Sequence, residues 1–157
     1  MTKDEEIERL RDQVKLYRFD YVTGLKQRQD FERDARAKFA EGFYLAIHDI
    51  NGLKQLNDSH GHPAGDSLIR QVANDLRMCP TMCTVYRVGG DEFTTIHCHS
   101  EVITDNDIKV DNTSSAVVHT RDYESVDDAV NAVDKIMMRR KSELKRRSED
   151  LGEGNER

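Results

Sequence analysis

The chain lacks tryptophan, contains only two prolines and three cysteines, and has no long apolar run. A membrane-spanning helix needs about 20 consecutive apolar residues, so we expect no membrane segment in this chain. Residues 1–11 are densely charged and carry no apolar stretch, which argues against a secretory signal. Nothing in the cysteine content indicates an oxidising compartment. We therefore expect reduced thiols and a cytoplasmic location.

A strong excess of positive charge is also missing, since 24 basic residues stand against 30 acidic ones and give a net charge of −6. This balance disfavours a general nucleic-acid partner, but it does not exclude a nucleotide ligand. A length of 157 residues is enough for one domain with a substantial core. A zinc site at Cys79, Cys83, His97 and His99 is one interpretation, although the spacing fits only loosely. Ordinary buried or half-exposed thiols are the other.

Hydrophobic periodicity predicts helices over residues 4–19, 27–40, 66–78 and 127–147, and strands over 43–50, 84–88, 93–98 and within 108–119. We expect a loop over 57–65 and a disordered polar tail over 148–157. The order of elements predicts an α/β (α+β) sandwich of the ferredoxin-like kind, in which helices flank a mostly antiparallel central sheet. We assign residues 1–19 to an N-terminal helix and 20–147 to the domain.

The first predicted helix carries one apolar stripe on an otherwise charged surface. Ile7, Leu10, Val14 and Tyr17 recur at intervals of three and four residues. The stripe either packs against the domain or pairs with a second copy of the chain, and two heptads are too few for a stable coiled coil alone.

Three carboxylates are expected to meet at one edge of the sheet. Asp49 ends the first strand, and Asp91 and Glu92 lie at the tip of a hairpin. Crowded like charges are costly unless a cation neutralises them, and oxygen ligands suit Mg2+ or Mn2+. An acidic hairpin alone is also typical of a solvated turn, and Gly89 and Gly90 either let a ligand approach the backbone or simply form that turn.

The segment after the first strand offers groups that suit a nucleotide. Gly52 and Leu53 present backbone N–H groups for phosphate, and Lys54 adds a positive charge. Asn57 and Asp66 are of the right type to pair with the edge of guanine. Each also has a plainer interpretation, because Asn is common in turns and Asp66 is a candidate cap for the helix that follows.

Four motifs occur together: residues 20–25 (DYVTGL), 49–58 (DINGLKQLND), 61–66 (GHPAGD) and 87–93 (RVGGDEF). In order and approximate spacing the set resembles the GGDEF-domain diguanylate cyclases, over about residues 18–98. The resemblance implies a nucleotidyl-cyclase palm with a five-stranded sheet. It also implies a homodimer that condenses two GTP molecules into cyclic di-GMP and releases two pyrophosphates, with two Mg2+ or Mn2+ ions in each active site.

The resemblance also assigns roles to individual residues. Metal would be held by Asp49, Asp91, Glu92 and the backbone carbonyl of Ile50, with Glu92 beside the attacking 3′-hydroxyl and Lys54 on the phosphates. The remaining substrate-binding residues would be Asn57, Asp66, Gly52, Leu53, Gly89, Gly90, Lys141 and Lys145. By the same comparison, the N-terminal helix sets dimerisation.

The sequence departs from the family pattern in three places. Asn51 stands where a second Asp is frequent, and residues 80–83 lack the Arg-x-x-Asp of the inhibitory product site, so we expect no product feedback there. The stretch between the hairpin and the next strand is too short for the family's usual helix. A catalytically silent GTP-binding module and a cyclase making a different dinucleotide therefore remain alternatives, although Asp66 favours guanine.

Overall fold

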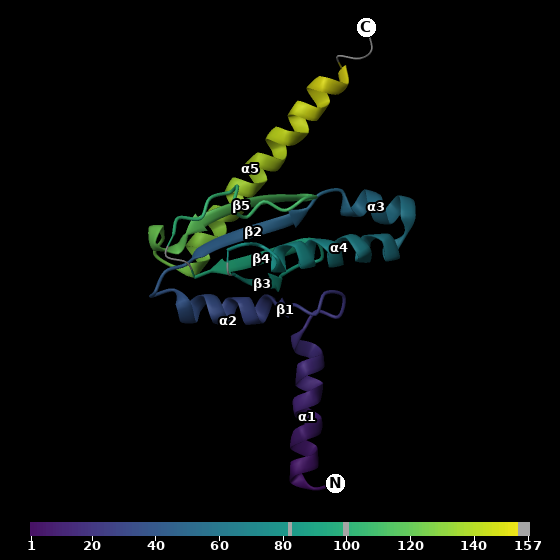
Figure 1. The fold of residues 1–157 in the computed structure, drawn as a ribbon, viewed down its shortest axis with the longest axis vertical. Coiled ribbons are helices and arrows are strands. Elements are labelled where there is room, and N and C mark those ends of the chain that lie inside the picture. The colour runs from purple at the N-terminus through teal and green to yellow at the C-terminus, as the bar shows by residue number, and fades with distance from the viewer. Residues whose placement is uncertain (82, 99–100, 154–157) are drawn as a thin grey trace.

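The computed structural model describes residues 1–81, 83–98 and 101–153, and it forms one five-stranded sheet with the strand order β1-β3-β4-β2-β5 (Figure 1). The strands are β1 (Lys26–Gln27), β2 (Tyr44–Ile50), β3 (Cys83–Arg87), β4 (Glu92–His97) and β5 (Thr113–His119). The helices are α1 (Lys3–Arg18), α2 (Arg28–Lys38), α3 (Leu53–His60), α4 (His62–Arg77), the short 3-10 turn η1 (Thr120–Asp122) and α5 (Val126–Glu153).

The sheet is mostly antiparallel, as predicted. β2 pairs antiparallel with β4 and β5, β4 pairs antiparallel with β3, and only the short β1 runs parallel to its neighbour β3. Residues 45–50 of the central strand β2 are all buried, since helices or loops cover both of its faces. This explains why the first half of β2, residues 44–47, is a continuous apolar run rather than an alternating one.

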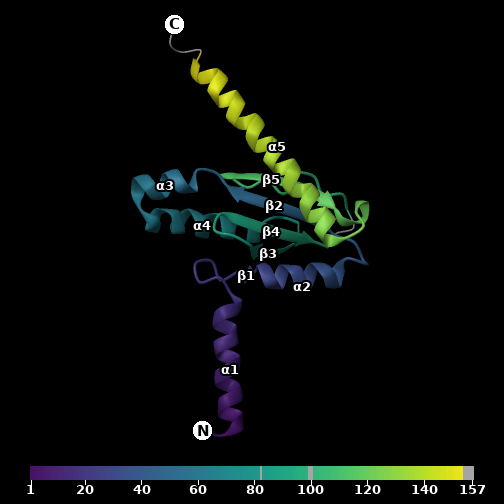
Figure 2. The same cartoon turned by 180° about the vertical axis from the view of Figure 1, so that it is seen from behind.

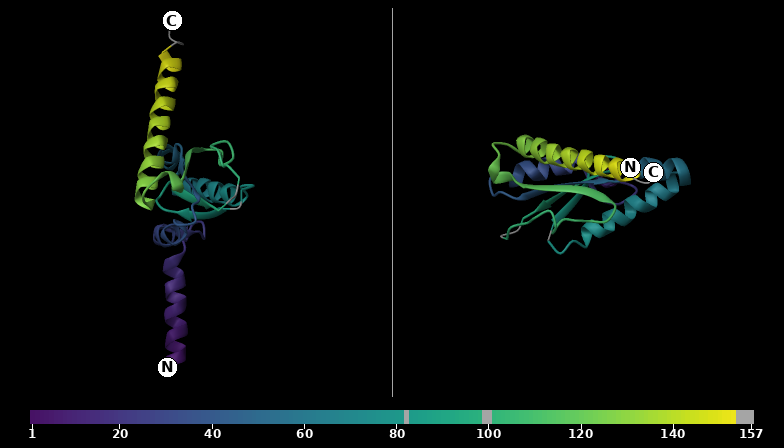
Figure 3. Two further views of the ribbon diagram at one scale, coloured as in Figure 1. Left: turned by 90° about the vertical axis from the view of Figure 1, so that its left-hand side faces the viewer. Right: turned by 90° about the horizontal axis from the view of Figure 1, so that it is seen from above.

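Two layers of apolar side chains hold the helices on the sheet. On one face, α2 and α5 pack on residues such as Leu45, Ile47 and Ile96. On the other face, α4 packs on Ile50, Val85 and other buried residues. Figure 2 shows α5 running across its face of the sheet, and Figure 3 shows α4 and the loop of residues 101–112 on the opposite side from α5.

α1 leaves the body of the molecule and does not bury its apolar stripe. A capping box of Thr2 and Glu5 starts the helix. Ile7, Leu10 and Val14 are 46, 48 and 60% exposed, so these three residues do not pack against the domain. The side chain of Tyr17, the fourth residue of the stripe, lies outside the described residues. Of the two interpretations of the stripe, pairing with a second copy is therefore the one that stays open.

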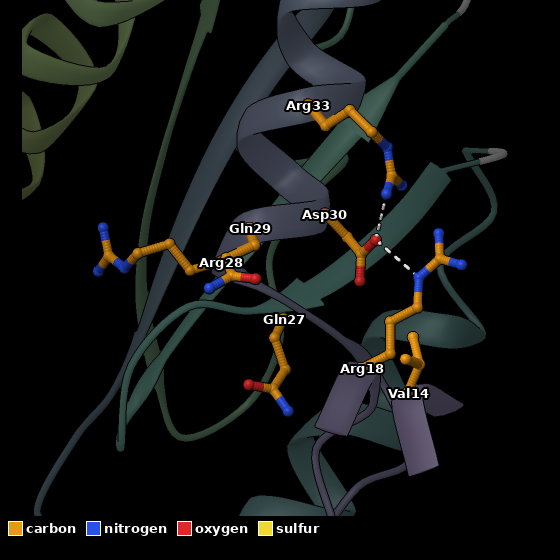
Figure 4. A pocket seen from close by; sticks show the side chains of 7 residues that line it. All are labelled: Val14, Arg18, Gln27, Arg28, Gln29, Asp30 and Arg33. Carbon is orange, nitrogen blue, oxygen red and sulfur yellow. Dashed lines mark hydrogen bonds and ion pairs between the residues drawn. The ribbon is translucent and has the colours of Figure 1, made fainter. Parts of the chain in front are cut away.

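A hollow of about 620 Å3 marks the junction between α1 and α2 (Figure 4). The guanidinium groups of Arg18 and Arg33 both reach the buried carboxylate of Asp30, at 3.1 and 2.7 Å. The Arg18–Asp30 pair ties the end of α1 to the start of α2, and the Arg33–Asp30 pair lies within α2. The hollow therefore lies beside the contact between α1 and α2, where Arg18 and Arg33 already form ion pairs with Asp30.

Three sequence-based boundaries need correction. Residues 53–60 form helix α3 rather than a loop, because good helix formers follow the left-handed Gly52 (φ 71°) and Gly61 ends the helix. α4 begins at His62 with Pro63 in its first turn, four residues before the predicted start. α5 continues to Glu153, so the expected polar tail is helical up to that residue. Residues 154–157 lie outside the described residues.

Residues 101–112, which connect β4 to β5, form neither a helix nor a strand. Their apolar side chains cover the β2–β5 side of the sheet, with Ile103, Ile108 and Val110 buried. Beneath the loop, a line of polar side chains crosses three strands: His48 lies 2.9 Å from Ser115 Oγ and 3.2 Å from Thr95 Oγ1, which lies 2.7 Å from His97. His97 Nδ1 in turn lies 2.9 Å from Thr81 Oγ1.

The cysteines form no metal site with these histidines. The three thiols are free, and His97 is occupied by hydroxyl groups. In the described part of the chain, the one group of metal-ligating side chains lies elsewhere, and His99 lies outside that part. The ordinary-thiol interpretation therefore holds for the described residues. Among the described helices, none is long and apolar enough to cross a lipid bilayer.

Asp34 should make the fold sensitive to acid. Burial raises its pKa, but hydrogen bonds from Arg33, Tyr86 and Lys26 outweigh burial and bring the pKa to about 2. A lowered folded-state pKa stabilises the fold above the unfolded-state pKa, and this stabilisation disappears as the pH falls through 2. The stability advantage of the wild type over Asp34→Asn should shrink by about 2 kcal/mol between about pH 5 and pH 2. Urea unfolding of both proteins measures this, and equal acid sensitivity would contradict it.

Candidate metal and nucleotide site

The three predicted carboxylates do come together. Asp49 lies at the end of β2 opposite Glu92, the first residue of β4, and the amide of Ile50 donates to the carbonyl of Asp91 at 2.8 Å. One oxygen of each of Asp49, Asp91 and Glu92 lies within 4.8 Å of the others. The antiparallel register of β2 and β4 therefore builds the acidic cluster, which is the set Asp49, Asp91 and Glu92.

The electrostatics of the acidic cluster favour a cation. Burial raises the pKa of Asp49, and the neighbouring Asp91 and Asp134 raise it further, while Lys141 opposes them. Burial and the charges of Asp49 and Asp91 likewise raise the pKa of Glu92. Asp49 Oδ1 is buried and forms an ion pair with Lys141 of α5, which therefore supplies positive charge at the acidic cluster. This donor set of closely spaced carboxylate oxygens fits a hard divalent cation such as Mg2+ or Mn2+.

The two glycines before the acids have different surroundings. A Cβ on Gly89 would lie 2.8 Å from a carboxylate oxygen of Glu92, so the Glu92 side chain folds over the space that Gly89 leaves. A Cβ on Gly90 would meet no atom within 4 Å among the described residues. A side chain on Gly89 would therefore displace the Glu92 carboxylate from its present position. Gly90 is free to let a ligand approach the backbone.

A network of polar contacts holds the tip of the β3–β4 hairpin against the turn of residues 20–24. The carboxylate of Asp20 accepts hydrogen bonds from Thr23 N at 2.8 Å and Thr23 Oγ1 at 2.6 Å, and it pairs with Arg87 at 2.8 Å. Arg87 also donates to the carbonyl of Gly90 at 2.7 Å. The first and last motifs of the sequence are therefore one structural unit, which fixes the tip of the hairpin relative to the turn at Gly24.

Asn57 and Asp66 lie on the helices that follow the acidic strand. Asn57 Oδ1 is buried and accepts no hydrogen bond from the described residues. It packs so closely on α4 that a Cβ on Gly65 would lie 1.9 Å from it. Asp66 is inside α4 rather than at its cap, which is Gly61. The plainer interpretations as turn and cap are therefore wrong, and the buried Asn57 oxygen is left without a hydrogen-bond partner from the described residues.

The start of α3 is suited to an anion. Its cap, Gly52, has no capping side chain, so the first N–H groups of the helix, including those of Leu53 and Lys54, lack a side-chain partner from the cap. Lys54 is exposed in the first turn. Free N–H groups and the helix dipole together attract phosphate.

Other residues have less direct positions. Asn51 accepts a hydrogen bond from Ser114 at 2.8 Å, so the Asn that replaces the family's second Asp joins β2 to β5. Lys145 is exposed one turn beyond Lys141 on α5. Our sequence reasoning missed Asp134, which acts electrostatically on Asp49 and Glu92 from α5. No local signal in the sequence distinguishes Asp134 from other helix-surface acids.

Comparison with known proteins decides the family. A family model described as "Diguanylate cyclase, GGDEF domain" matches residues 17–108. This chain belongs to the GGDEF-domain family. Diguanylate cyclase VdcA of Vibrio cholerae is 36% identical over 104 residues, which is 62% of this chain and 31% of that relative. An uncharacterized membrane protein of Staphylococcus saprophyticus is 37% identical over 84 residues, 49% of this chain and 24% of that protein. The chain thus spans less than a third of either relative.

Solved structures confirm the GGDEF fold. The coiled coil and GGDEF domain of DgcB from Caulobacter crescentus, in complex with c-di-GMP, superposes with a TM-score of 0.69 at 24% identity, covering 88% of this chain and 90% of that one. The S helix-GGDEF-EAL part of Vibrio cholerae LapD, bound to c-di-GMP, gives a TM-score of 0.74 at 20% identity, covering 92% and 39%. The predicted family and palm-like fold are therefore confirmed.

Proposed function

We propose that this GGDEF domain is a diguanylate cyclase, which condenses two GTP molecules into cyclic di-GMP. The observation that carries the proposal is the acidic cluster of Asp49, Asp91 and Glu92, complete and paired with Lys141. A silent domain has no need to keep three carboxylates so close together, because their mutual repulsion destabilises the fold. Similarity to VdcA over the matched residues supports the same conclusion.

Each protomer would hold one GTP. Asn57 and Asp66 would pair with guanine, and the start of α3 with Lys54 would bind phosphate. Lys141 would move from Asp49 to the phosphates, and Lys145 would add charge. Asp49, Asp91, Glu92 and the Ile50 carbonyl would hold two Mg2+ or Mn2+ ions, which when bound neutralise phosphate charge and activate the 3′-hydroxyl.

In the reaction, Glu92 would accept the proton of the 3′-hydroxyl. The carboxylate of Glu92 belongs to the acidic cluster and is of a suitable type for a general base there. The 3′-oxygen of one GTP would attack the α-phosphorus of the other, forming a phosphodiester as the bond to pyrophosphate breaks. Two such steps close the ring, so two protomers must face each other. The exposed stripe of Ile7, Leu10 and Val14 is suited to bring them together.

Product analysis tests the proposal directly. The protein is incubated with Mg2+ and GTP, ATP or both, at concentrations that allow dimers, and the products are identified by mass spectrometry. We expect cyclic di-GMP from GTP alone. A mixed or adenine-only product would favour the different-dinucleotide alternative. No cyclic dinucleotide, together with measurable GTP binding, would favour the silent module and overturn the proposal.

Asp66 should set the preference for guanine. Replacing Asp66 by alanine removes the carboxylate that would accept from the guanine N1–H and N2–H2 groups. We expect the ratio of GTP to ATP affinity to fall by at least about tenfold, because a site loses discrimination when its polar partner is removed. Competition binding of both nucleotides measures the ratio. The exposed neighbour variant Ser67→Ala is the control, and an unchanged ratio in Asp66→Ala would rule out this role.

A further inference from the structure

One group of contacts joins α5, the loop of residues 101–112 and the outer edge of the sheet. Arg140 donates to both carboxylate oxygens of Asp105, at 2.9 and 2.6 Å, and also to the carbonyl of Ser115 at 2.8 Å. Asp105 in turn accepts from the amide of Val117 at 3.3 Å. We call this group, formed by Asp105, Arg140, Ser115 O and Val117 N, the edge clamp.

The edge clamp occupies main-chain groups that no strand pairs. β5 is the last strand of the sheet. The main-chain N–H and C=O groups of Ala116 point toward β2, whereas those of its neighbours Ser115 and Val117 point away from the sheet. The outward carbonyl of Ser115 and amide of Val117 are those bound by Arg140 and Asp105. Two-point contact of a guanidinium with a carboxylate is also the most directional of ion pairs. The clamp therefore attaches α5 to the sheet in a defined position.

The position of the edge clamp along α5 links it to the candidate active site. Among the described side chains of α5, Met137 is the last buried one, and those beyond Arg140 and Lys141 are exposed as α5 leaves the body (Figure 1). Consecutive helical residues point about 100° apart. Arg140 can thus hold the sheet edge while Lys141 reaches Asp49 at the end of β2.

We propose that Asp105 and Arg140 are positioning residues, which hold the end of α5 so that Lys141 remains within reach of the candidate site and contributes to binding of the GTP triphosphate. The inference rests on the proposed function, in which Lys141 contacts phosphate. It gives Asp105, and through it the loop of residues 101–112, a role in substrate binding, although Asp105 lies at the outer edge of β5 and does not touch the acidic cluster.

Binding of 3′-deoxy-GTP with Mg2+ tests the proposal, because this nucleotide lacks the attacking hydroxyl and is not turned over. Arg140→Ala and Asp105→Ala should each weaken binding by about tenfold, the smaller end of the range for residues that orient a ligating group. The effect of Asp105→Ala is the sharper one. Removing a negative charge should strengthen binding of an anion if only net charge matters, whereas loss of the edge clamp weakens it.

Further variants and hydrogen exchange separate loss of the edge clamp from other causes of weaker nucleotide binding. Arg139→Ala removes an equal charge from the neighbouring exposed position and should leave affinity within about twofold. Arg140→Ala in a Lys141→Ala background should add nothing, since the clamp acts through Lys141. The milder Asp105→Asn variant serves if Asp105→Ala does not fold. Hydrogen exchange should show the amide of Val117 and those of residues 140–147 less protected in both clamp variants.

The outcomes distinguish the two proposals. If the wild type binds the nucleotide and the clamp variants bind as tightly as Arg139→Ala, the positioning role is wrong. Additive effects of Arg140→Ala and Lys141→Ala would also overturn it. If the wild type does not bind the nucleotide, the proposed function itself fails, and hydrogen exchange alone reports whether the edge clamp holds α5.

Discussion

Glu92→Gln should reduce formation of cyclic di-GMP by about 100-fold or more, while GTP affinity stays within about threefold. Glutamine has nearly the same shape but neither accepts the proton of the 3′-hydroxyl nor carries charge for a metal ion. It should still fold over Gly89, because the contact there is steric. We therefore expect the loss in the chemical step and not in binding of guanine, which would contact Asn57 on α3 and Asp66 on α4.

Initial rates and equilibrium binding, measured on the same preparation with Mg2+, separate the two quantities. Glu124→Gln is a matched control, since it removes the same charge from an exposed position before α5. Turnover by Glu92→Gln equal to that of the control would refute the role of Glu92. Loss of binding with a normal fold would instead assign Glu92 to substrate affinity.

Gly65→Ala should also weaken GTP binding strongly, because it displaces the side chain of Asn57. The new Cβ would lie 1.9 Å from Asn57 Oδ1, well inside contact distance, so Asn57 must leave its place. We expect GTP affinity to fall by about 10- to 100-fold, as for Asn57→Ala, because a positioned polar partner for the base is lost. Alanine is favoured over glycine inside a helix by about 1 kcal/mol, so a simple destabilisation is not the expected cause.

The double variant Asn57→Ala/Gly65→Ala provides the control. With the Asn57 side chain removed, the new Cβ has space, and the second substitution should cost no further affinity. Binding isotherms and thermal unfolding of the four proteins complete the cycle. Wild-type affinity in Gly65→Ala would show that Asn57 does not contact the nucleotide. Additive losses would show that Gly65 acts on binding by another route.

The sequence alone predicts the elements that depend on local pattern. The hydrophobic patterns of β2 and α4 are strong, and Gly89 and Gly90 predict the hairpin between β3 and β4. The acidic cluster could therefore be predicted from the sequence. α3 was missed because a polar eight-residue helix has no buried residue to produce an apolar period. Its existence depends on the left-handed Gly52 and on packing against α4.

Long-range pairs are beyond such reasoning. Arg140 and Asp105 are 35 residues apart, and Arg87 and Asp20 are 67 apart. Each is an ordinary charged residue in its own neighbourhood, where a solvated surface is the natural interpretation. The packing of α5 and the loop of residues 101–112 against β5 brings Arg140 to Asp105, whereas the pairing of β1 with β3 brings Asp20 beside Arg87. The motif comparison placed Asp20 and Arg87 in one family pattern, yet it did not reveal that they touch.

The line of polar groups beneath the loop of residues 101–112 has a consequence for His48 and His97. Burial and His97 lower the pKa of His48 to about 3, so its imidazole is neutral at ordinary pH. Thr95 Oγ1 carries one proton and has an Nε2 atom on each side. When both rings are neutral, the hydroxyl donates to one ring and accepts from the other, so the two rings then adopt opposite tautomers. A change in the tautomer of either histidine therefore changes the tautomer of the other. In this way the hydroxyl of Thr95 couples β2 to β4.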